Sequence, residues 1–401
     1  MKKKNSLKVP YVSSVTGKEE VRAVIKALNT STQMSKNVKL FEKKISNLYG
    51  YKYGIATNSG SSSLLLGMEA LNIPKGSEVI TPSLTFSTTV SCILKNNLIP
   101  TFVDCKSLSE LIIDTDRIEK LITKKTRALC IPNLLGNMPD WIHLKYLAKK
   151  YNLLILDDSA DLIGARYKNK LPSFYSDISI TSFYGAHMIT CAGNGGIVMT
   201  SNTKFMKKIK LLRSWGRRSS LFSDSETINK RFNVKINNFY YDSKFIFDEV
   251  GYMMEPSEIG CAYGLAQLKK LKKFSALRKK NSTKLISVLK KYDDLVYVPK
   301  MNPDADSVWF AIPIVLKNKC KFSRKDFQIY LERRNIQTRV IFTGNIIRQP
   351  GFKFIKKKLD PNGYQISDYI MENGLLVGCH HGMNNNQLNH LTDSIEKFLK
   401  Q

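Results

Sequence analysis

The stretch Tyr53–Leu71, YGIATNSGSSSLLLGMEAL, joins a short apolar strand to a helix through a turn that contains glycine and several serines. Glycine lets the backbone approach an anion closely, and the free N–H groups at a helix start point toward that anion. Gly60 and Ser61 are therefore candidates for binding a phosphate. The same serines also suit an ordinary helix N-cap, so the turn alone does not decide between the two functions.

Strands and helices alternate along the first half of the chain. Strand-like apolar runs occur near residues 77–86, 99–105, 127–137, 153–164 and 195–202, and runs with helical spacing separate most of them. This alternation predicts an α/β fold with a mostly parallel sheet covered by helices on both faces. Ligands of such sheets bind at the carboxyl ends of the strands, and every polar cluster described below lies at such an end.

The rest of the chain predicts a smaller α+β unit. Residues 256–295 have a long helical pattern, strand-like runs follow at 308–316 and 336–342, and helices are expected at 324–334 and 385–400. We therefore expect a large domain over residues 1–275, which includes N-terminal helices at 19–29 and 37–48, and a small C-terminal domain over residues 276–401.

Net charge is the unusual feature of the composition. The chain has 63 Lys and Arg against 33 Asp and Glu, a formal net charge of +30. Such an excess attracts polyanions or an anionic substrate, but it also describes a lysine-rich surface without a specific partner. Because the lysines are scattered and no nucleic-acid-binding motif occurs, we expect no nucleic-acid partner. Steering of a phosphorylated small molecule fits the same charge.

Cysteine spacing and hydropathy bear on the compartment. The seven cysteines form no C-x-x-C pair, which favours reduced thiols and a cytoplasmic protein. The basic start MKKKNSLKVP has no apolar run behind it, so we do not expect a signal peptide. No apolar stretch reaches the length of a membrane span, and no membrane association is expected.

Acidic side chains end the strand-like run LLILDDSAD. Asp157 and Asp158 close the run, and Asp161 lies one turn further on. A carboxylate at a buried strand end is costly unless it meets a cation or hydrogen-bond donors. A protonated pyridine nitrogen would be such a partner, although a helix-capping pair of aspartates explains this segment equally well.

His187 stands in the stretch SFYGAHMITCAGNGG, between a strand end and a glycine-rich turn. Ser182, at the start of the stretch, can donate a hydrogen bond to a phosphate. A lone histidine is more often structural than catalytic, so the importance of His187 comes from its position among the other clusters.

Together these motifs resemble the sugar aminotransferase family of the DegT/DnrJ/EryC1/StrS type, fold-type-I pyridoxal-phosphate enzymes that act on nucleotide-linked keto sugars. The similarity runs from about Val9 to the C-terminus. It implies an aspartate-aminotransferase-like α/β fold, a mostly parallel sheet in the large domain, a small α+β C-terminal domain, and a homodimer with its site at the subunit interface.

The resemblance also implies roles for single residues. NSGSSSL, residues 58–64, matches the family's phosphate-binding motif NSGTAAL, and PSLTF offers Phe86 to the face of the cofactor ring. Asp158 matches the aspartate on the pyridine nitrogen. Asp161 lies where a histidine or glutamine of the family approaches the ring hydroxyl.

One departure selects a branch of the family. The family's S-F-x-x-x-K motif ends in the lysine that binds the cofactor covalently, whereas SFYGAH ends in His187. The histidine resembles the nucleotide-sugar 4-keto-6-deoxyhexose 3-dehydratases, as do WGR at 215–217 and TRVIFTGNIIRQP at 338–350. In the latter run, Arg339, Asn345 and Arg348 are candidates near the sugar or its diphosphate, and surface ion pairing is the alternative for both arginines.

Some enzymes of this branch carry a [2Fe–2S] cluster on four cysteines. The matching positions here are Ala160, Ser219, Leu221 and about Asn229, and none can supply the thiolate that such a cluster needs. No iron–sulfur cluster is therefore expected. The chain matches better the other kind, known from colitose biosynthesis, which uses pyridoxal 5′-phosphate and pyridoxamine 5′-phosphate with glutamate as amine donor.

The resemblance thus implies loss of the C3 hydroxyl from a nucleotide sugar, with GDP-4-keto-6-deoxymannose as the expected substrate, in deoxysugar and surface-polysaccharide synthesis. A neutral imidazole can take a proton and return it near neutral pH. Two alternatives stay open: an aminotransferase that tolerates histidine, and a non-catalytic homologue that binds a nucleotide sugar. Two further departures from the family slightly favour the non-catalytic homologue. Asn194 replaces a family glutamate after an inserted residue, and Met253 replaces the asparagine that reaches the phosphate across the dimer interface.

Overall fold

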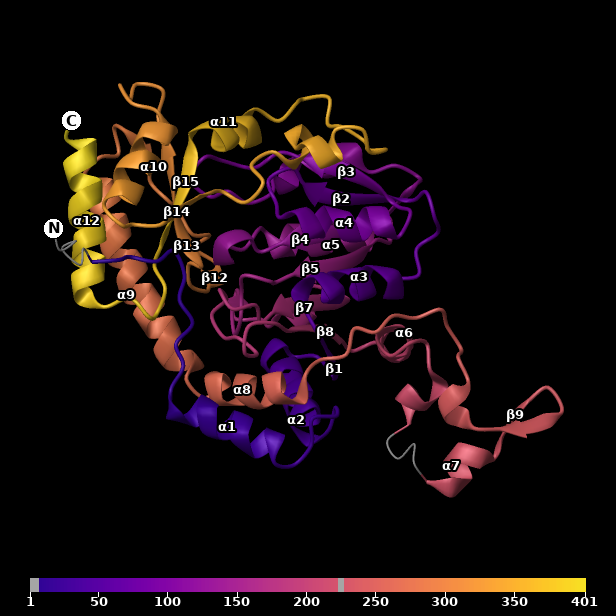
Figure 1. Cartoon of the computed structure of the whole chain (residues 1–401). Helices are drawn as coiled ribbons and strands as arrows, with labels where there is room; N and C mark the ends of the chain where they lie inside the picture. Colours follow the sequence, from indigo (N-terminus) through magenta and orange to yellow (C-terminus); the bar gives the residue numbers. More distant parts are fainter. Residues whose placement is uncertain (1–6, 223–226) are drawn as a thin grey trace.

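The computed structural model describes residues 7–222 and 227–401, which form a larger seven-stranded sheet and a smaller four-stranded sheet with helices around them (Figure 1). Helix α9 (Leu271–Lys290) leads from the larger sheet to the smaller one. The helix continues without a break through residue 275, so the division predicted there stays a prediction.

Six of the seven strands of the larger sheet run in the same direction, and one runs the opposite way. The order across the sheet is β1 (Tyr53–Thr57), β8 (Gly196–Thr200), β7 (Ile178–Ser182), β5 (Leu154–Asp158), β4 (Thr126–Pro132), β2 (Glu78–Pro82) and β3 (Ile99–Val103). The strands from β7 to β3 are parallel, and β8 is antiparallel to both β1 and β7. The predicted mostly parallel sheet is therefore confirmed.

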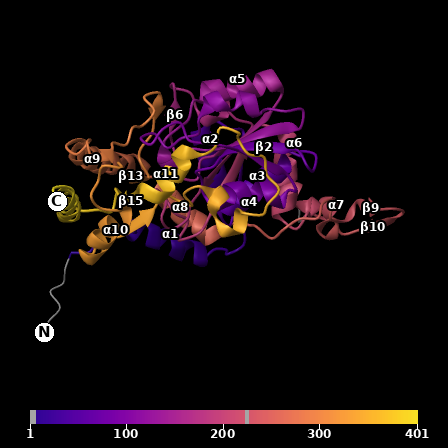
Figure 2. The same ribbon diagram turned by 90° about the horizontal axis from the view of Figure 1, so that it is seen from above.

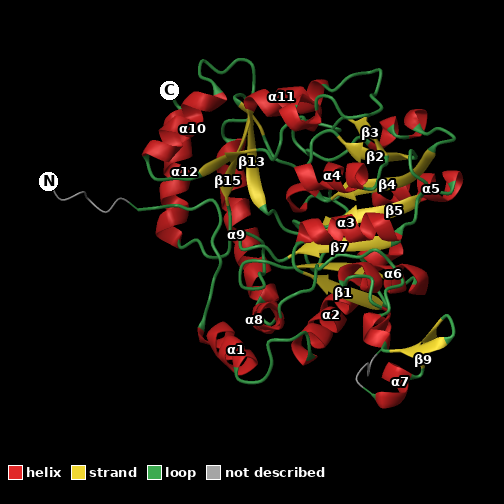
Figure 3. Ribbon diagram, turned by 45° about the vertical axis from the view of Figure 1, so that its right-hand side comes forward, coloured by secondary structure: helices red, strands yellow, loops and turns green. Residues whose placement is uncertain are grey.

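Helices cover both faces of this sheet (Figure 3). They can do so because its strands carry apolar side chains on both sides. Ile55 of β1 packs with one group of helices and its neighbour Ala56 packs with the other. The first group is α3 (Gly60–Ala70), α4 (Ser87–Lys95) and α6 (Thr203–Arg213). The second is α2 (Lys36–Tyr49) and α5 (Trp141–Tyr151).

Helices α8 (Glu258–Leu268) and α1 (Lys18–Leu28) lie below the large sheet in the view of Figure 1. Helix α8 contacts both α1 and α2. The buried Glu258 carboxylate accepts the N–H groups of Ser35, Asn37 and Val38, and so satisfies free donors at the start of α2. The helices predicted at 19–29 and 37–48 are confirmed, and the helical pattern at 256–295 corresponds to α8 and α9.

The smaller sheet is antiparallel and has its own core. Its strands are, in order, β11 (Val296–Tyr297), β13 (Ala311–Leu316), β15 (Gly374–Gly378) and β14 (Thr338–Val340). The helices beside it are α10 (Arg324–Arg333), α11 (Gln365–Asn373) and α12 (Asn385–Leu399). The predicted small α+β unit is confirmed. Val9 forms an isolated bridge with Ile336 and belongs to the same core, so the chain near Val9 packs with the smaller sheet.

Two small features lie outside the sheets. The two-residue strands β6 (Arg166–Tyr167) and β12 (Ala305–Asp306) pair with one another and link distant parts of the chain. Helix α7 (Ile228–Phe232) and the hairpin of β9 (Val234–Ile236) and β10 (Phe239–Tyr241) project from the body (Figure 2). Residues 228–252, here called the aromatic arm, were not predicted to form this projection.

Candidate active site

A cavity of about 900 Å³ lies between the two sheets. Pro132, Asp158 and Ser182, at the carboxyl ends of β4, β5 and β7, line one side of it, and Arg339 of β14 lines the other. Parallel strands bring their carboxyl ends to one edge of a sheet, which is why sequence-distant polar residues meet here. The predicted residues that line this cavity are Gly60, Ser61, Phe86, Asp158, Asp161, Ser182, His187 and Arg339.

The turn between β1 and α3 lies against the end of β7. Ser59 caps α3 by accepting the N–H of Ser62 at 3.1 Å. A Cβ added to Gly60 would lie 2.6 Å from the Ser182 Cβ and 2.9 Å from its Oγ, so glycine is required. The start of α3 and the Ser61 and Ser182 hydroxyls therefore lie together, an arrangement that suits an anion with several oxygens.

The two adjacent aspartates at the end of β5 have different surroundings. The Asp157 carboxylate accepts hydrogen bonds from Asn133, Ser159 and Ser179, so its bonding is internal. Asp158 lines the cavity and accepts from Thr89 Oγ1 at 2.7 Å and from the Ala160 N–H at 3.2 Å. Burial raises the pKa of Asp158. A cation in the cavity would favour its ionised form, as the pyridinium hypothesis requires.

Asp161 lies on the same wall, and one backbone donor holds it. The Leu135 N–H donates to Asp161 Oδ2 at 3.0 Å. Burial raises the pKa of Asp161 to about 7, and the charge of Asp158 acts in the same direction. Leu135 has a φ of 58°, in the left-handed region that leucine rarely occupies. The donor to Asp161 is thus part of a strained turn.

His187 is half-buried, and one ring nitrogen is fixed. Its Nδ1 lies 2.5 Å from the Ala160 carbonyl oxygen, so Nδ1 carries the proton and Nε2 keeps its lone pair. The ring lies 5.4 Å from that of Phe310, between centroids. Burial lowers the pKa of His187 to about 4. The imidazole is therefore neutral at physiological pH and can accept a proton at Nε2.

The glycine-rich turn after His187 is packed against the α3 cap. A Cβ on Gly196 would lie 2.3 Å from the Ser59 carbonyl oxygen. Thr190 Oγ1 accepts the Gly193 N–H at 2.9 Å, and Ala192 turns the chain with a φ of 58°. The longer turn puts Asn194 on the exposed rim of the cavity.

Phe86 supplies an aromatic wall. Its side chain is 51% exposed, lines the cavity and meets the Phe342 ring edge-on. An exposed ring face of this kind suits stacking on a planar ligand.

The three residues predicted to lie near the sugar or its diphosphate occupy different places in the structure. Arg339 lines the cavity, and its guanidinium lies 5.6 Å from the centroid of the Tyr11 ring. Asn345 is fully buried and donates to Asp368 at 2.7 Å. Arg348 forms a two-pronged pair with the same carboxylate. Neither Asn345 nor Arg348 lines the cavity, so only Arg339 is placed to meet a ligand within this chain.

Met253 and the four positions that match the cluster cysteines of related enzymes lie in different parts of the structure. Met253 is 58% exposed and its backbone pairs with Ser214. Ser219 and Leu221 share a short 3-10 turn, Asn229 lies in α7, and Ala160 lies beside His187. Across residues 7–222 and 227–401, no three His, Cys, Asp or Glu side chains are grouped so as to hold a metal ion.

Sequence reasoning missed Tyr11, Phe310, Leu135 and Arg278. Tyr11 and Phe310 line the cavity from segments with no local motif. Arg278 is fully buried behind His187. A signal for it existed, because Arg278 lies four residues after Phe274 on the buried stripe of α9, where a charged residue is unusual.

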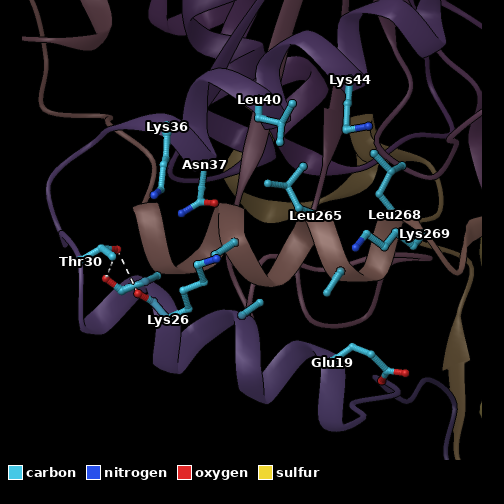
Figure 4. Close-up of a pocket in the computed structure, with 14 residues that line it drawn as sticks. Glu19, Lys26, Thr30, Lys36, Asn37, Leu40, Lys44, Leu265, Leu268 and Lys269 are labelled. Carbon is cyan, nitrogen blue, oxygen red and sulfur yellow. Dashed lines mark hydrogen bonds between the residues drawn. The ribbon is translucent and has the colours of Figure 1, made fainter.

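A second cavity, of about 420 Å³, opens between α1, α2 and α8. Figure 4 shows Leu40, Leu265 and Leu268 on its walls and several lysines around it. None of the predicted site residues lines this cavity. Among the helices of the described residues, none is long and apolar enough to cross a membrane.

Known proteins resemble this chain over nearly its whole length. It is 31% identical to the dTDP-4-dehydro-2,6-dideoxy-D-glucose 3-dehydratase of Saccharopolyspora spinosa, over 95% of this chain and 84% of that protein. It is 29% identical to the GDP-4-keto-6-deoxy-D-mannose 3-dehydratase of Yersinia pseudotuberculosis, over 98% and 100%. A solved GDP-4-keto-6-deoxymannose-3-dehydratase with a trapped PLP–glutamate geminal diamine has a TM-score of 0.87 and 26% identity, and covers 96% of this chain and 99% of its own.

These similarities agree with the fold and the cavity. The sheet order, the α3 cradle and the carboxylate at the end of β5 are those expected of a fold-type-I enzyme. The family match extends over residues 14–396. The chain belongs to the DegT/DnrJ/EryC1/StrS aminotransferase family.

Proposed function

We propose that this chain is a pyridoxal-5′-phosphate-dependent 3-dehydratase that removes the C3 hydroxyl of a nucleotide-linked 4-keto-6-deoxy sugar, with glutamate as amine donor. The observation that carries the proposal is His187. A neutral imidazole, with Nδ1 on the Ala160 carbonyl and Nε2 available to the cavity, occupies the place of the family's lysine. The relatives named above that act as 3-dehydratases support the same reaction class.

The residues present fit the cofactor. The close approach of Gly60 to Ser182 leaves a cradle that a single Cβ would fill, and helix α3 begins there, as phosphate binding requires. Asp158, whose pKa burial raises, would gain a cationic partner in a ring nitrogen. Phe86 would stack on the ring. When bound, the cofactor supplies the amine that condenses with the sugar ketone and a ring that withdraws electrons.

His187 suits elimination better than a lysine would. Its low pKa makes it a weak base, but once protonated it is a correspondingly strong acid. It can therefore take a proton at Nε2 and return it to the departing C3 hydroxyl, which leaves as water. A positioned group of this kind typically contributes about 10²–10⁴-fold to the rate. Histidine cannot form the covalent bond to the cofactor that lysine forms.

The nucleotide end of the substrate is anionic, and the cavity offers Arg339 to it. The named relatives act on dTDP- and GDP-linked sugars, so both nucleotides must be tested. GDP-4-keto-6-deoxymannose is the substrate we expect. The excess of positive charge over the whole chain would attract any such diphosphate.

Product analysis tests the proposal. The protein is incubated with pyridoxal 5′-phosphate, glutamate and GDP-, CDP-, UDP- or dTDP-linked 4-keto-6-deoxy sugars. We expect equal amounts of ammonia and 2-oxoglutarate, and a 3,6-dideoxy product that is one oxygen atom lighter. A product with nitrogen at C4 and no free ammonia would establish the aminotransferase alternative instead. Failure to bind the cofactor, seen as no new absorbance band, would favour the non-catalytic homologue.

Exchange of His187 for lysine tests its position. The H187K protein should retain the cofactor after borohydride reduction and denaturation, whereas the wild-type protein should release it. Absence of trapping in a folded H187K protein would place residue 187 away from the reacting carbon.

We further propose a homodimer in which the aromatic arm contacts the second copy. The arm exposes Phe239, Tyr240 and Phe245 by 56%, 65% and 57%. Monomeric proteins rarely expose such an apolar patch, and the arm projects from the body as a contact element would (Figure 2). Met253, at the base of the arm, is likewise exposed.

Light scattering with size-exclusion chromatography tests the dimer. The double change Phe239→Ser and Tyr240→Ser should shift the protein toward the monomer mass. Tyr146→Ser is the matched control, because Tyr146 is 55% exposed on α5, away from the arm. An unchanged dimer in the double variant, or an equal loss in the control, would show that the arm is not the contact.

A further inference from the structure

Arg278 of α9 is a buried cation without a carboxylate partner. Its side chain is 0% exposed. Among the described residues no carboxylate forms an ion pair with it, and its Nη2 has no hydrogen-bond partner. A charge in the interior is costly unless nearby groups compensate it or make use of it.

The guanidinium is fixed by neutral acceptors. Nη1 donates to the Phe310 carbonyl oxygen at 2.7 Å, and Nε donates to His381 Nδ1 at 3.4 Å. The His381 ring in turn stacks on Phe274, one turn earlier in α9, with centroids 3.9 Å apart. Arg278 is thus held rigidly at the beginning of β13, next to the wall of the cavity.

A series of hydrogen bonds leads from Arg278 to Asp161. The Phe310 carbonyl accepts from Arg278, the Phe310 N–H donates to the Leu135 carbonyl at 2.8 Å, and the Leu135 N–H donates to Asp161 at 3.0 Å. Leu135 makes both of its bonds from a left-handed conformation. Strain of this kind persists where the surrounding structure imposes it, often at functional sites.

Phe310 also connects Arg278 with His187. The guanidinium carbon lies 5.6 Å from the centre of the Phe310 ring, and the His187 ring lies 5.4 Å from the same ring. A fixed positive charge here opposes protonation of His187 and favours ionisation of Asp161. In the structure the charge of Arg278 accordingly acts to lower the pKa of both groups.

We propose that Arg278 is a positioning residue of the reaction: through Phe310 and Leu135 it aligns Asp161 and His187 in the cavity wall, and its charge favours the ionised form of Asp161 and the neutral form of His187. The inference rests on the function proposed above for that cavity. Arg278 does not line the cavity. Its contribution is the charge and the alignment of two groups that do, Asp161 and His187.

Other titratable groups surround His187 and must be held constant in any test. They come from the β5 end, the His187 loop, the N-terminal segment and the small sheet: Asp158, Asp161, Tyr184, Tyr11, Arg339, Cys379, His380 and His381. His380 and His381 also have lowered pKa values, to about 4 and about 3. His380 therefore titrates over the same range as His187, and its signal must be followed separately.

NMR titration of the protein without cofactor tests the proposal, and it needs no turnover. Histidine is labelled with ¹³C at Cε1, and the His187 signal is assigned by its loss in H187N. In R278M and R278Q the midpoint of His187 should rise by about one pH unit, the shift expected when a unit charge roughly 10 Å away is removed at an effective dielectric constant of about 20. R278K keeps the charge and should titrate like the wild type.

K273M is the matched control, because Lys273 is an exposed cation on the same helix. Its His187 midpoint should not move. An unchanged midpoint in R278M and R278Q, or an equal rise in K273M, would overturn the proposal. Where neither neutral variant folds, the wild type decides: a His187 midpoint near 6.5 would show that the buried cation is not felt. Absence of dehydratase activity would leave these results unaffected, and would count against the proposed reaction alone.

Discussion

Replacement of Gly60 by alanine should disrupt the cradle between α3 and β7. The new Cβ would lie 2.6 Å from the Ser182 Cβ, about 1 Å inside the normal contact of two carbon atoms. Ser182 cannot retreat easily, because β7 is paired on both sides, with β5 and β8. The start of α3 must therefore shift by about the same distance.

Two effects of this shift can be measured. Overpacking of this kind typically costs about 1–3 kcal/mol in the free energy of unfolding, so Tm without cofactor should fall by several degrees. Misplacement of charge-assisted bonds to the phosphate, each worth roughly 1.5–3 kcal/mol, should weaken cofactor binding by about 10- to 100-fold. Thermal unfolding and an absorbance titration with pyridoxal 5′-phosphate give the two values.

Three other glycine and serine changes isolate the cause. Gly185→Ala lies in the His187 loop, but its nearest contact would be an ordinary 3.7 Å, and Gly351→Ala meets nothing within 4 Å. Both should behave like the wild type. Ser182→Gly added to Gly60→Ala removes the clashing Cβ and Oγ, so it should restore Tm without restoring the full cofactor affinity. Wild-type Tm and affinity in Gly60→Ala would refute the close approach of the turn to Ser182.

Three further predictions follow from the charges of the site and the core. Because burial lowers the pKa of His187 to about 4, its basic form persists as pH falls through 6.5, and the NMR signal of the His187 ring should not shift between pH 7 and pH 5.5; a midpoint near pH 6.5 would contradict this. Asp158→Asn should weaken cofactor binding about 10- to 100-fold in an absorbance titration, whereas Asp157→Asn, which alters only internal bonds, should mainly lower Tm; equal losses of affinity would show that the two roles are not separate. Arg213→Met removes the ion-pair partner of Glu42, which lies 2.8 Å from Arg213 near the buried β1 edge. The free energy of unfolding, measured with urea, should fall by about 3–5 kcal/mol. A loss below about 1 kcal/mol would mean that the pair is effectively solvated.

The sequence by itself determined the elements and their general order. Apolar period and turn residues are local properties, so the strand–turn–helix at 53–71 and the helices at 37–48 and 385–400 could be located without a structure. The motifs at strand ends could also be assigned to one edge of a parallel sheet, and the histidine at position 187 could be seen to replace a lysine. These conclusions need only residue type, spacing and the resemblance to a family.

The tertiary structure alone decided which polar groups face the cavity. Asp157 and Asp158 are adjacent in sequence, yet one is bonded internally and the other is available to a ligand, because successive side chains of a strand point to opposite sides. Arg339, Asn345 and Arg348 share one motif, yet Asp368, more than 20 residues away from Asn345 along the chain, holds two of them away from the cavity. A series of hydrogen bonds connects Arg278 to Asp161 through Phe310 and Leu135, residues that come together when the two sheets pack. Such contacts depend on long-range packing, and no local pattern encodes them.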